Sequence, residues 1–494
     1  MTPVSPRVVE THVSYVFLFG DRAVKLKKPA RFEFVDLSTV DLRRIACRRE
    51  VELNRRLAPD VYLGTFAVVD DSGEAIDHLV VMRRMPDERR LSALVRAGAV
   101  STDEIHDLAR VIAAFHERAG RSPEIDAVGR ATALRARWEA GFHEVHPFVG
   151  GILDEAVESE IETLADRYLA GREALFDERI AHGAIRDGHG DLLADDVFLL
   201  DDGPRVLDCL EFDDALRYGD VLADVGFLAM DLERLGAPEL ASEFLAHYRE
   251  LTAATWPRSL AHHFVAFRAH IRAKVACFRH VQGDPDAAVE ARRLLELCLD
   301  HLRAARVRLV LVGGAPGTGK TTAARGVAER LGWALLRSDV VRKELAGLAP
   351  ESHAPAPLDE GIYGEAVTER VYTTLLDESE MLLRHGEPVV LDATWASAAT
   401  RTRARELAAR TASELVEIRC VLDPGIVAQR VGARARSGHD ASDATPELAA
   451  QLALRFEAWP EAAVVDTDAP GARVVGRVVA QIVGDVADRE YEHE

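Results

Sequence analysis

The sequence predicts two architectures in succession, an α+β part followed by an α/β part. Residues 1–86 read as short strands with one helix, and apolar residues at helical spacing dominate from 91 to 305. From residue 306 onward, short apolar runs alternate with helical segments, which is typical of a parallel sheet with helices on both sides. A chain of 494 residues is too long to fold around a single hydrophobic core. We therefore expect domains at 1–88, 89–304 and 305–494.

The composition is that of a soluble globular protein, with 48% hydrophobic and 29% charged residues. The formal net charge of −21 disfavours nucleic acid and anionic membrane surfaces as partners. The 5 cysteines are far apart and form no C-x-x-C pair, so we expect free thiols and no zinc site. No apolar run approaches the length of a membrane span, and we expect a cytoplasmic protein without membrane contact.

The first part begins with a strong hairpin signal. Ser14–Phe19 and Arg22–Lys27 are alternating apolar runs joined by Gly20-Asp21. A helix is expected over Leu42–Leu57, and further strands over Thr65–Val69 and His78–Arg83.

After a largely helical stretch, residues 189–212 read HGDLLADDVFLLDDGPRVLDCLEF, two short strands with carboxylates at their ends. Asp191 is placed to orient or deprotonate a hydroxyl, while Asp196 and Asp208 are placed to hold Mg²⁺ on phosphates. The alternative is a turn with solvated aspartates. Helical segments resume from 219 to about 305.

The run His189-Gly190-Asp191-Leu192, followed by Val206-Leu207-Asp208, resembles the aminoglycoside phosphotransferase family, small-molecule kinases with a bilobal protein-kinase-like fold. The resemblance covers about residues 10–300 and implies that Asp191 is the catalytic base and Asp208 a metal ligand.

The same resemblance extends upstream and downstream of this loop. Ala23-Val24-Lys25 is similar to the family's A-x-K, which implies that Lys25 contacts the nucleotide phosphates and pairs with a helix glutamate. Glu50 is the expected partner, with Glu52 as the alternative. Lys27 lies on the same strand face as Lys25 and stays open as a substitute. The run 217–220 with Asp224 is similar to the family's structural segment after the metal ligand.

Three departures from the family pattern affect the phosphate-handling parts. Asp196 stands where the family has Asn, Leu210 replaces a common Gly, and Glu10–Ser14 lacks the glycines of the nucleotide-covering loop. A kinase-like domain that has lost catalysis is therefore an alternative.

The second part opens with a phosphate-binding motif. The apolar run Arg306–Val312 leads into a full match to G-x-x-x-x-G-K-[ST], and a helical segment follows. Glycines let backbone N–H groups curl around phosphate oxygens, Lys320 reaches the β- and γ-phosphates, and Thr321 ligates Mg²⁺. The expected nucleotide-binding residues of this loop are Gly314, Ala315, Pro316, Gly317, Thr318, Gly319, Lys320, Thr321 and Thr322.

Further strands place charged residues near this loop. Leu335–Asp339 is expected to be a strand ending in Asp339, which can accept a proton from a hydroxyl, with Arg342 near the transferred phosphate. Asp392 ends the expected strand Glu387–Asp392 and supports the Mg²⁺ shell. After another expected strand, Glu417–Leu422, two arginines share a helix face, Arg430 and Arg434.

Residues 306–490 resemble the small P-loop kinases of the zeta-toxin, polynucleotide-kinase and gluconate-kinase type, on Asp339/Arg342, Asp392-Ala393-Thr394 and the two arginines. The whole chain is similar to a bacterial family that fuses an aminoglycoside phosphotransferase-like domain to such a kinase domain. This resemblance implies two sites for Mg²⁺ and ATP and a small hydroxylated acceptor. The alternative is a nucleotide-sensing stress or toxin-type protein whose first domain is catalytically weak.

One helical segment, Phe264–Arg279, carries basic residues among apolar ones. It either lines a site for an acidic substrate or phosphate in the first domain, or is an amphipathic packing helix. The basic residues of this segment include Arg268, Arg272, Lys274 and Arg279.

Overall fold

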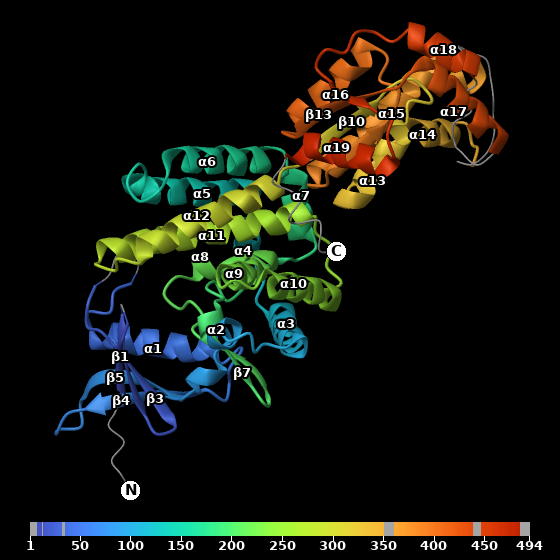
Figure 1. Ribbon diagram of the computed structural model, residues 1–494. Coiled ribbons are helices and arrows are strands. Elements are labelled where there is room, and N and C mark those ends of the chain that lie inside the picture. The colour runs from blue at the N-terminus through green and yellow to red at the C-terminus, as the bar shows by residue number, and fades with distance from the viewer. Residues whose placement is uncertain (1–6, 12, 32–34, 350–359, 438–445, 485–494) are drawn as a thin grey trace. The chain divides into compact units, whose positions relative to one another are not determined.

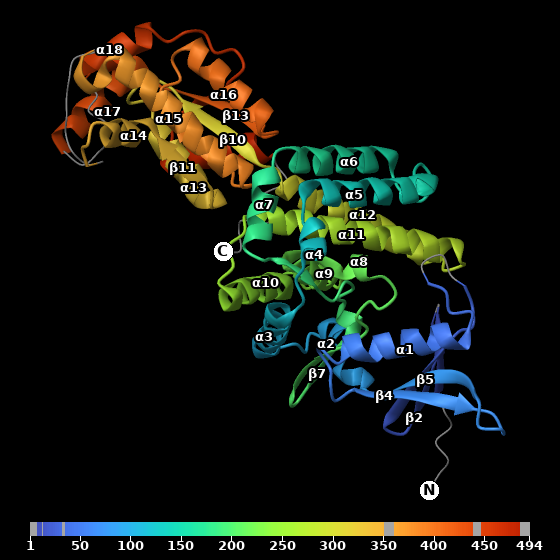
Figure 2. The same ribbon diagram turned by 180° about the vertical axis from the view of Figure 1, so that it is seen from behind.

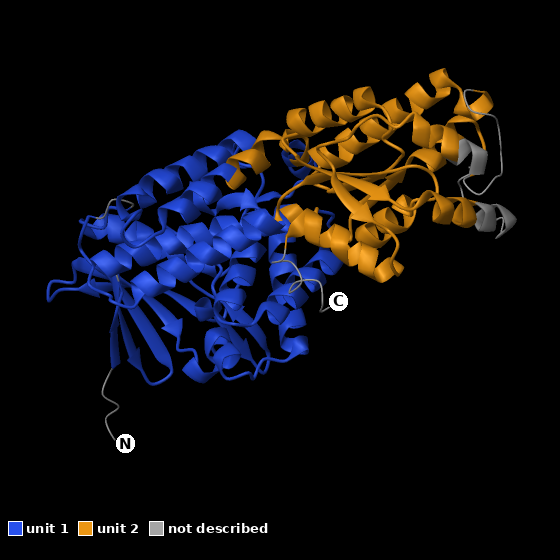
Figure 3. Ribbon diagram, turned by 45° about the horizontal axis from the view of Figure 1, so that its top comes forward, with its two compact units in different colours: residues 1–163, 176–256, 260–304 blue, residues 164–175, 257–259, 305–494 orange. Residues whose placement is uncertain are grey.

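The computed structural model describes residues 7–11, 13–31, 35–349, 360–437 and 446–484, without the side chains of 432–437 and 446–449. The chain divides into two compact units (Figure 3). Unit 1 comprises residues 1–163, 176–256 and 260–304, and unit 2 comprises 164–175, 257–259 and 305–494. The three domain boundaries expected from the sequence stay a prediction.

Unit 1 begins with a small lobe built on an antiparallel sheet (Figure 1). The sheet has five strands in the order β1-β2-β3-β5-β4. Helix α1 (Val40–Asn54) packs on β4 and β5, and its buried Cys47 and Val51 join Val61 and Val80 in one apolar cluster. Thr39 caps the start of α1 by accepting a hydrogen bond from the backbone N–H of Leu42. The strands of this sheet are β1 (Arg7–Glu10), β2 (Ser14–Phe19), β3 (Arg22–Lys27), β4 (Tyr62–Val69) and β5 (Ala75–Arg83).

The larger lobe of unit 1 is mostly helical, with two small antiparallel hairpin-like pairs inserted (Figure 2). One pair is β6 (Ile185–Asp187) with β9 (Tyr218–Asp220), and the other is β7 (Val197–Leu200) with β8 (Gly203–Val206). Both views show α11 and α12 side by side. The helices of this lobe are α2 (Leu91–Arg96), α3 (Thr102–Arg118), α4 (Pro123–Ala127), α5 (Ala131–Val145), α6 (Glu155–Ala170), α7 (Glu173–Ala181), α8 (Asp214–Arg217), α9 (Val221–Arg234), α10 (Pro238–Thr252), α11 (Arg258–Val281) and α12 (Ala287–Ala304).

Unit 2 is built on a five-stranded sheet in the order β11-β12-β10-β13-β14, in which every neighbouring pair is parallel. Its strands are β10 (Arg308–Gly313), β11 (Ala334–Arg337), β12 (Val389–Asp392), β13 (Glu414–Val421) and β14 (Ala463–Asp466). Its helices are α13 (Lys320–Leu331), α14 (Ser338–Leu345), α15 (Glu365–Arg384), α16 (Ala398–Arg410), α17 (Pro424–Ser437), α18 (Pro446–Leu454) and α19 (Gly471–Val483).

The core of unit 2 follows from strand alternation. Val310 and Val312 of β10 pack in one cluster with Val327 of α13 and Val478 of α19, while Leu309 and Leu311 are equally buried and, by strand alternation, point to the opposite face. A strand buried on both faces needs helices on both sides of the sheet. The predicted α+β and α/β architectures, a bilobal kinase-like part followed by a parallel-sheet P-loop part, are confirmed.

Several bounds differ from the sequence prediction, and two of the differences bear on strand ends and on unpredicted strands. The strand expected over Leu335–Asp339 ends at Arg337, and Asp339 lies instead in the first turn of α14. Strands β1 and β14 were not predicted; both are four residues long, and β1 is exposed throughout. All cysteines are free and buried, as expected. None of the helices in the described parts of the chain has the length and apolar content needed to cross a bilayer.

Candidate active sites

In unit 1, the ammonium of Lys25 on β3 lies between two carboxylates from distant segments. Its Nζ is 2.9 Å from Oε1 of Glu50 on α1 and donates a hydrogen bond to Oδ1 of Asp208 at 3.1 Å. Burial opposes the charge on Lys25, but Asp208 and Glu50 raise its pKa well above the usual value. Three of the residues predicted from the sequence therefore meet at one point, and Glu52, the alternative to Glu50, pairs with Arg49 instead.

The second lysine of the strand, Lys27, is part of the same cluster. Its Nζ donates to Oε2 of Glu50 at 2.7 Å and to Oε1 of Glu211 at 3.0 Å. Burial opposes the charge of Lys27, whereas Glu50 and Glu211 raise its pKa to about 12. Glu50 thus pairs with both lysines. Burial alone would raise the pKa of Glu50, but the two ammonium groups lower it by more, so the net shift is downward. Sequence reasoning missed Glu211, for which the nearby Asp208 was the available signal.

The loop that carries Asp191 is held by a buried aspartate of α9. Both carboxylate oxygens of Asp224 accept backbone hydrogen bonds, from His189 N–H at 2.5 Å and from Gly190 N–H at 2.9 Å. Gly190 has φ 87°, and a Cβ there would lie 3.2–3.3 Å from Arg217 and Leu210. The glycine in the His-Gly-Asp motif is therefore required by the path of the loop.

Two carboxylates in and after this loop have raised pKa values. Burial, followed by Asp208 and Asp191, raises the pKa of Asp196 well above the usual value for an aspartate. Burial also raises the pKa of Asp191, with Arg272 opposing this effect and Asp208 adding to it. Asp208 itself has φ 60°, a backbone conformation that non-glycine residues adopt at a cost and mostly at functional sites.

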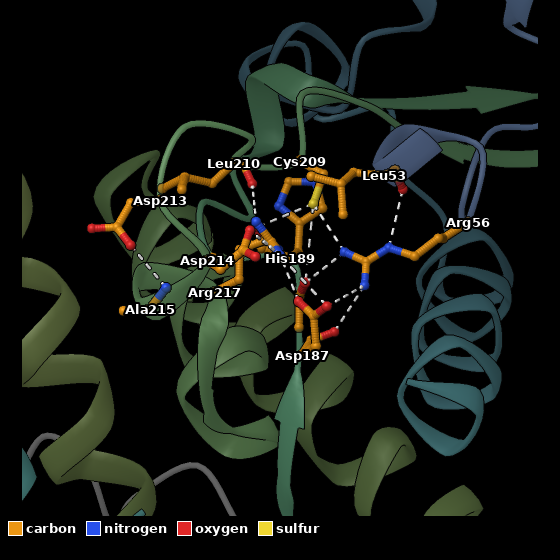
Figure 4. A network of polar contacts seen from close by, with 12 residues as sticks. Leu53, Arg56, Asp187, His189, Cys209, Leu210, Asp213, Asp214, Ala215 and Arg217 are labelled. Atoms are coloured by element: carbon orange, nitrogen blue, oxygen red, sulfur yellow. Dashed lines mark hydrogen bonds and ion pairs between the residues drawn. The ribbon is translucent and has the colours of Figure 1, made fainter. Parts of the chain in front are cut away.

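A pair of arginines ties α1 to the base of the loop (Figure 4). Arg56, just after α1, donates to the carbonyl oxygens of Asp187 at 3.0 Å and Gly188 at 2.9 Å. From the other side, Arg217 donates to Oδ1 of Asp187 at 2.8 Å and to the carbonyl of Leu210 at 3.0 Å. These contacts position the loop against the small lobe. Arg56 was not predicted, since nothing in its local sequence marks it.

In unit 2, the phosphate-binding loop joins β10 to α13 with three glycines at positive φ. They are Gly314 (141°), Gly317 (85°) and Gly319 (81°). A Cβ at Gly314 would lie 2.5 Å from the carbonyl of Cys420, and one at Gly317 would lie 2.6 Å from Val431. Ala315, Pro316 and Thr318 complete the turn, with the Thr318 hydroxyl donating to the Ala315 carbonyl at 2.8 Å. Lys320, Thr321 and Thr322 begin α13, where free backbone N–H groups favour a bound anion.

The predicted residues Asp339 and Asp392 lie near Lys320. Burial raises the pKa of Asp339, with Lys320 opposing and Asp392 adding to the effect. Arg337 donates from Nε to Oδ2 of Asp392 at 3.4 Å, and Oδ1 of Asp392 is buried without a hydrogen-bond partner among the described residues. Arg342 lies close enough to lower the pKa of Asp339, but its Nη1 is engaged with the carbonyl of Ile362 at 2.7 Å and the hydroxyl of Thr368 at 3.1 Å.

Of the two arginines predicted on one helix, the structure describes the side chain of Arg430 only. Arg430 donates to the carbonyl of Thr467 at 3.3 Å, and the Thr467 hydroxyl donates to the carbonyl of Thr318 at 2.7 Å, so Thr467 links Arg430 to the phosphate-binding loop. Arg434 is on the same helix, but its side chain lies outside the described residues.

The donor sets fit Mg²⁺ held together with phosphate. No group of three or more His, Cys, Asp or Glu side chains in the described segments forms a metal cage. Mg²⁺ commonly binds through one or two carboxylates and substrate phosphates. In unit 1 the mutual repulsion of Asp196 and Asp208, and in unit 2 the unpartnered oxygen of Asp392, suit that arrangement.

Residues 309–459 match a family model described as an AAA domain, which spans the phosphate-binding loop and confirms the predicted P-loop domain. Two solved structures show similarity, each to one part of the chain. A choline/ethanolamine kinase family protein from Mesorhizobium loti is 13% identical, covers 61% of this chain and 92% of its own, and has a TM-score of 0.39. A gluconokinase from Sinorhizobium meliloti is 20% identical, covers 38% of this chain and 95% of its own, and has a TM-score of 0.27.

An uncharacterized protein of Mycobacterium tuberculosis is similar over almost the whole length. It is 45% identical over 470 residues, which are 95% of this chain and 94% of the relative. The chain belongs to the same family as this mycobacterial protein.

Proposed function

We propose that the protein is an ATP- and Mg²⁺-dependent phosphotransferase with two nucleotide sites, one in each unit, that phosphorylates a hydroxyl of a small molecule. The observation that supports this most directly is the position of Lys25 between Glu50 and Asp208. A buried lysine held by a helix glutamate and facing an aspartate is the arrangement that kinases use on nucleotide phosphates.

In unit 1, Asp191 is the proposed catalytic base. The acceptor hydroxyl oxygen attacks the γ-phosphorus of ATP, and its proton passes to the Asp191 carboxylate. The bond between the γ-phosphorus and the β–γ bridging oxygen breaks, and its electron pair leaves with ADP. The raised pKa of Asp191 suits a group that must accept a proton during the reaction.

In unit 2, Lys320 with the arginines of α17, Arg430 and Arg434, is proposed to neutralise charge on the γ-phosphate. Asp339 would orient the acceptor oxygen, and Arg342, one turn further along α14, would lie near the transferred phosphate. Magnesium, when held by Asp208 with Asp196 in unit 1 and by Thr321 with Asp392 nearby in unit 2, supplies charge neutralisation on the phosphates.

Two single variants of the full chain test the proposal, with sugars, amino sugars and aminoglycosides as acceptors. K320A is expected to abolish the product made in unit 2, and D191A to slow transfer in unit 1 by roughly 10²–10⁴-fold. Each variant should leave the other product in place. Separation of phosphorylated products by mass spectrometry measures this.

The competing hypothesis is a nucleotide sensor, favoured by Asp196 in the position of an Asn and by the lack of glycine in Glu10–Ser14. A sensor would show only slow ATP hydrolysis that K320A removes and D191A leaves unchanged. That result, with no phosphorylated acceptor, contradicts a two-site phosphotransferase.

A further inference from the structure

Helix α11 presents one basic side chain that stands apart from its neighbours. Arg268 donates to the carbonyl of Ala223, Lys274 lies 2.6 Å from Glu144, and Arg279 pairs with Asp284 and Glu290. Arg272 is half-buried on the same helix. It makes no hydrogen bond or ion pair with any residue in the described part of the chain.

Arg268 fixes where this helix meets the loop that carries Asp191. Its Nη1 donates to the carbonyl of Gly190 at 3.4 Å, one residue before Asp191. Arg272 follows four residues later, so it lies on the same helix face one turn further on. Of the charges around Asp191, Arg272 has the strongest effect on its pKa, ahead of Asp208 and Arg268.

Besides Arg272 and Arg268, the charges that act on Asp191 are two carboxylates. Asp208 and Asp231 both raise the pKa of Asp191, and Asp231 is itself engaged by the Ala194 N–H at 2.9 Å and Arg234 at 2.7 Å. Arg272 acts on the Asp191 carboxylate through space but forms no ion pair or hydrogen bond with it, so its guanidinium has donors to offer a ligand. Its planar fork suits a carboxylate or a phosphate.

We propose that Arg272 forms an anion subsite beside Asp191, so that the hydroxyl acceptor of unit 1 carries a carboxylate or phosphate group. This rests on the proposed role of Asp191. A polycationic acceptor would meet like charge at this position, and an anionic one would gain a charge-assisted hydrogen bond that fixes its hydroxyl near the base.

A binding experiment tests the subsite without requiring turnover. In a K320A background saturated with Mg²⁺ and the non-hydrolysable analogue AMP-PNP, inorganic phosphate is titrated by calorimetry. We expect phosphate to bind, R272Q to weaken it at least tenfold, and R272K to restore part of it. R292Q removes an exposed arginine of α12 and serves as the matched control, with affinity unchanged.

Three results would overturn the subsite. They are absence of phosphate binding in the AMP-PNP complex, equal affinity in R272Q, and binding seen with ADP but lost with AMP-PNP. The last result would assign Arg272 to the γ-phosphate rather than to the acceptor.

An acceptor panel of matched carbon skeleton then tests the substrate class in K320A, with Mg²⁺ and ATP in place of AMP-PNP. D-gluconate and D-glucose 6-phosphate are expected to accelerate ADP release more than D-glucose or D-glucosamine. R272Q should raise KM for the two anions at least tenfold with a smaller change in kcat. Equal or faster release with glucosamine overturns the inference. Absence of release with every member contradicts the proposed function, and the phosphate titration then decides the subsite alone.

Discussion

Glu50 is a buried carboxylate of the small lobe that faces two ammonium groups, those of Lys25 and Lys27. Lys25 reaches Asp208 as well, whereas Lys27 is turned to Glu211 and is almost fully buried. The two lysines are two residues apart on one strand face, yet only Lys25 lies against an aspartate proposed to hold metal. We therefore propose phosphate binding for Lys25 and a structural role for Lys27.

The structural role of Lys27 predicts a large loss of stability on its removal. K27M leaves Glu50 and Glu211 with one ammonium group between them, and breaking a buried ion pair in this way costs about 3–5 kcal/mol. The double variant K27M/E211Q removes one of the two carboxylates and should recover part of that loss. Urea denaturation monitored by circular dichroism measures both. Equal stability of K27M and the unaltered protein would show that the cluster does not depend on Lys27.

Asp196 predicts the opposite effect, a substitution that stabilises. The pKa of Asp196 is raised in the folded state, so its ionisation opposes folding. The stability contributed by the protonated Asp196 is therefore lost as pH rises from the unfolded pKa of about 3.9 through the folded pKa. D196N removes the ionisation and should raise Tm at pH 7, by roughly 2–4 °C for each kcal/mol, with no gain near pH 4.

The comparison is made by thermal unfolding without nucleotide or Mg²⁺. D71N, which removes an exposed turn carboxylate, is the control and should leave Tm unchanged at both pH values. A lower Tm for D196N at pH 7 would contradict the assigned repulsion among Asp191, Asp196 and Asp208.

At the level of elements, the phosphate-binding loop predicts a strict requirement for glycine. In G317A the alanine would have to adopt a backbone φ of 85°. Its Cβ would lie 2.6 Å from Val431 and 3.0 Å from Val427 of α17. We expect a loss of about 1–3 kcal/mol and of nucleotide binding in unit 2.

G476A is the matched control, because Gly476 lies inside α19 with no atom within 4 Å of an added Cβ. There the same substitution should stabilise by about 0.5–1 kcal/mol, since alanine favours the helix. Calorimetric Tm and titration with AMP-PNP measure both variants. Normal nucleotide affinity in G317A would contradict the proposed cradle.

Elements whose signals are local could be predicted closely. Strands β2 and β3 have the predicted bounds because the Gly20-Asp21 turn fixes where each one ends. The end of β11 was misplaced by two residues, since Ser338 and Asp339 suit a helix start as well as a strand end. Exposed β1 has no apolar alternation that would separate it from a loop.

The sites divide in the same way. Asp191, Asp208 and Lys320 lie in motifs whose spacing is local. The partners Glu211 and Arg56 could not be assigned, because their roles come from contacts across the fold, and the sequence left open whether the segment with Arg272 lines a site. Lys27 and Glu211 are 184 residues apart, and Arg56 is 132 from Gly188. A sequence shows that such side chains are charged, but only packing decides which charges meet.

The whole molecule has a net charge of −21, and its two phosphate-handling motifs lie in different units. An acidic protein needs local positive charge to hold a triphosphate, and each proposed site offers a lysine, Lys25 in one unit and Lys320 in the other. Two independent local sites predict two independent occupancies, whatever the acceptors are.

We therefore expect the full chain to bind two equivalents of AMP-PNP in the presence of Mg²⁺, measured by calorimetry. K320A and D208N should each lower the stoichiometry to about one, because each removes a phosphate or metal contact from a different unit. EDTA should weaken binding at both sites. K320A/D208N should bind none, and D71N should bind two as the matched acidic control. One equivalent in the unaltered chain, abolished by K320A alone, would leave unit 1 without a nucleotide and contradict the role assigned to Lys25, Glu50 and Asp208.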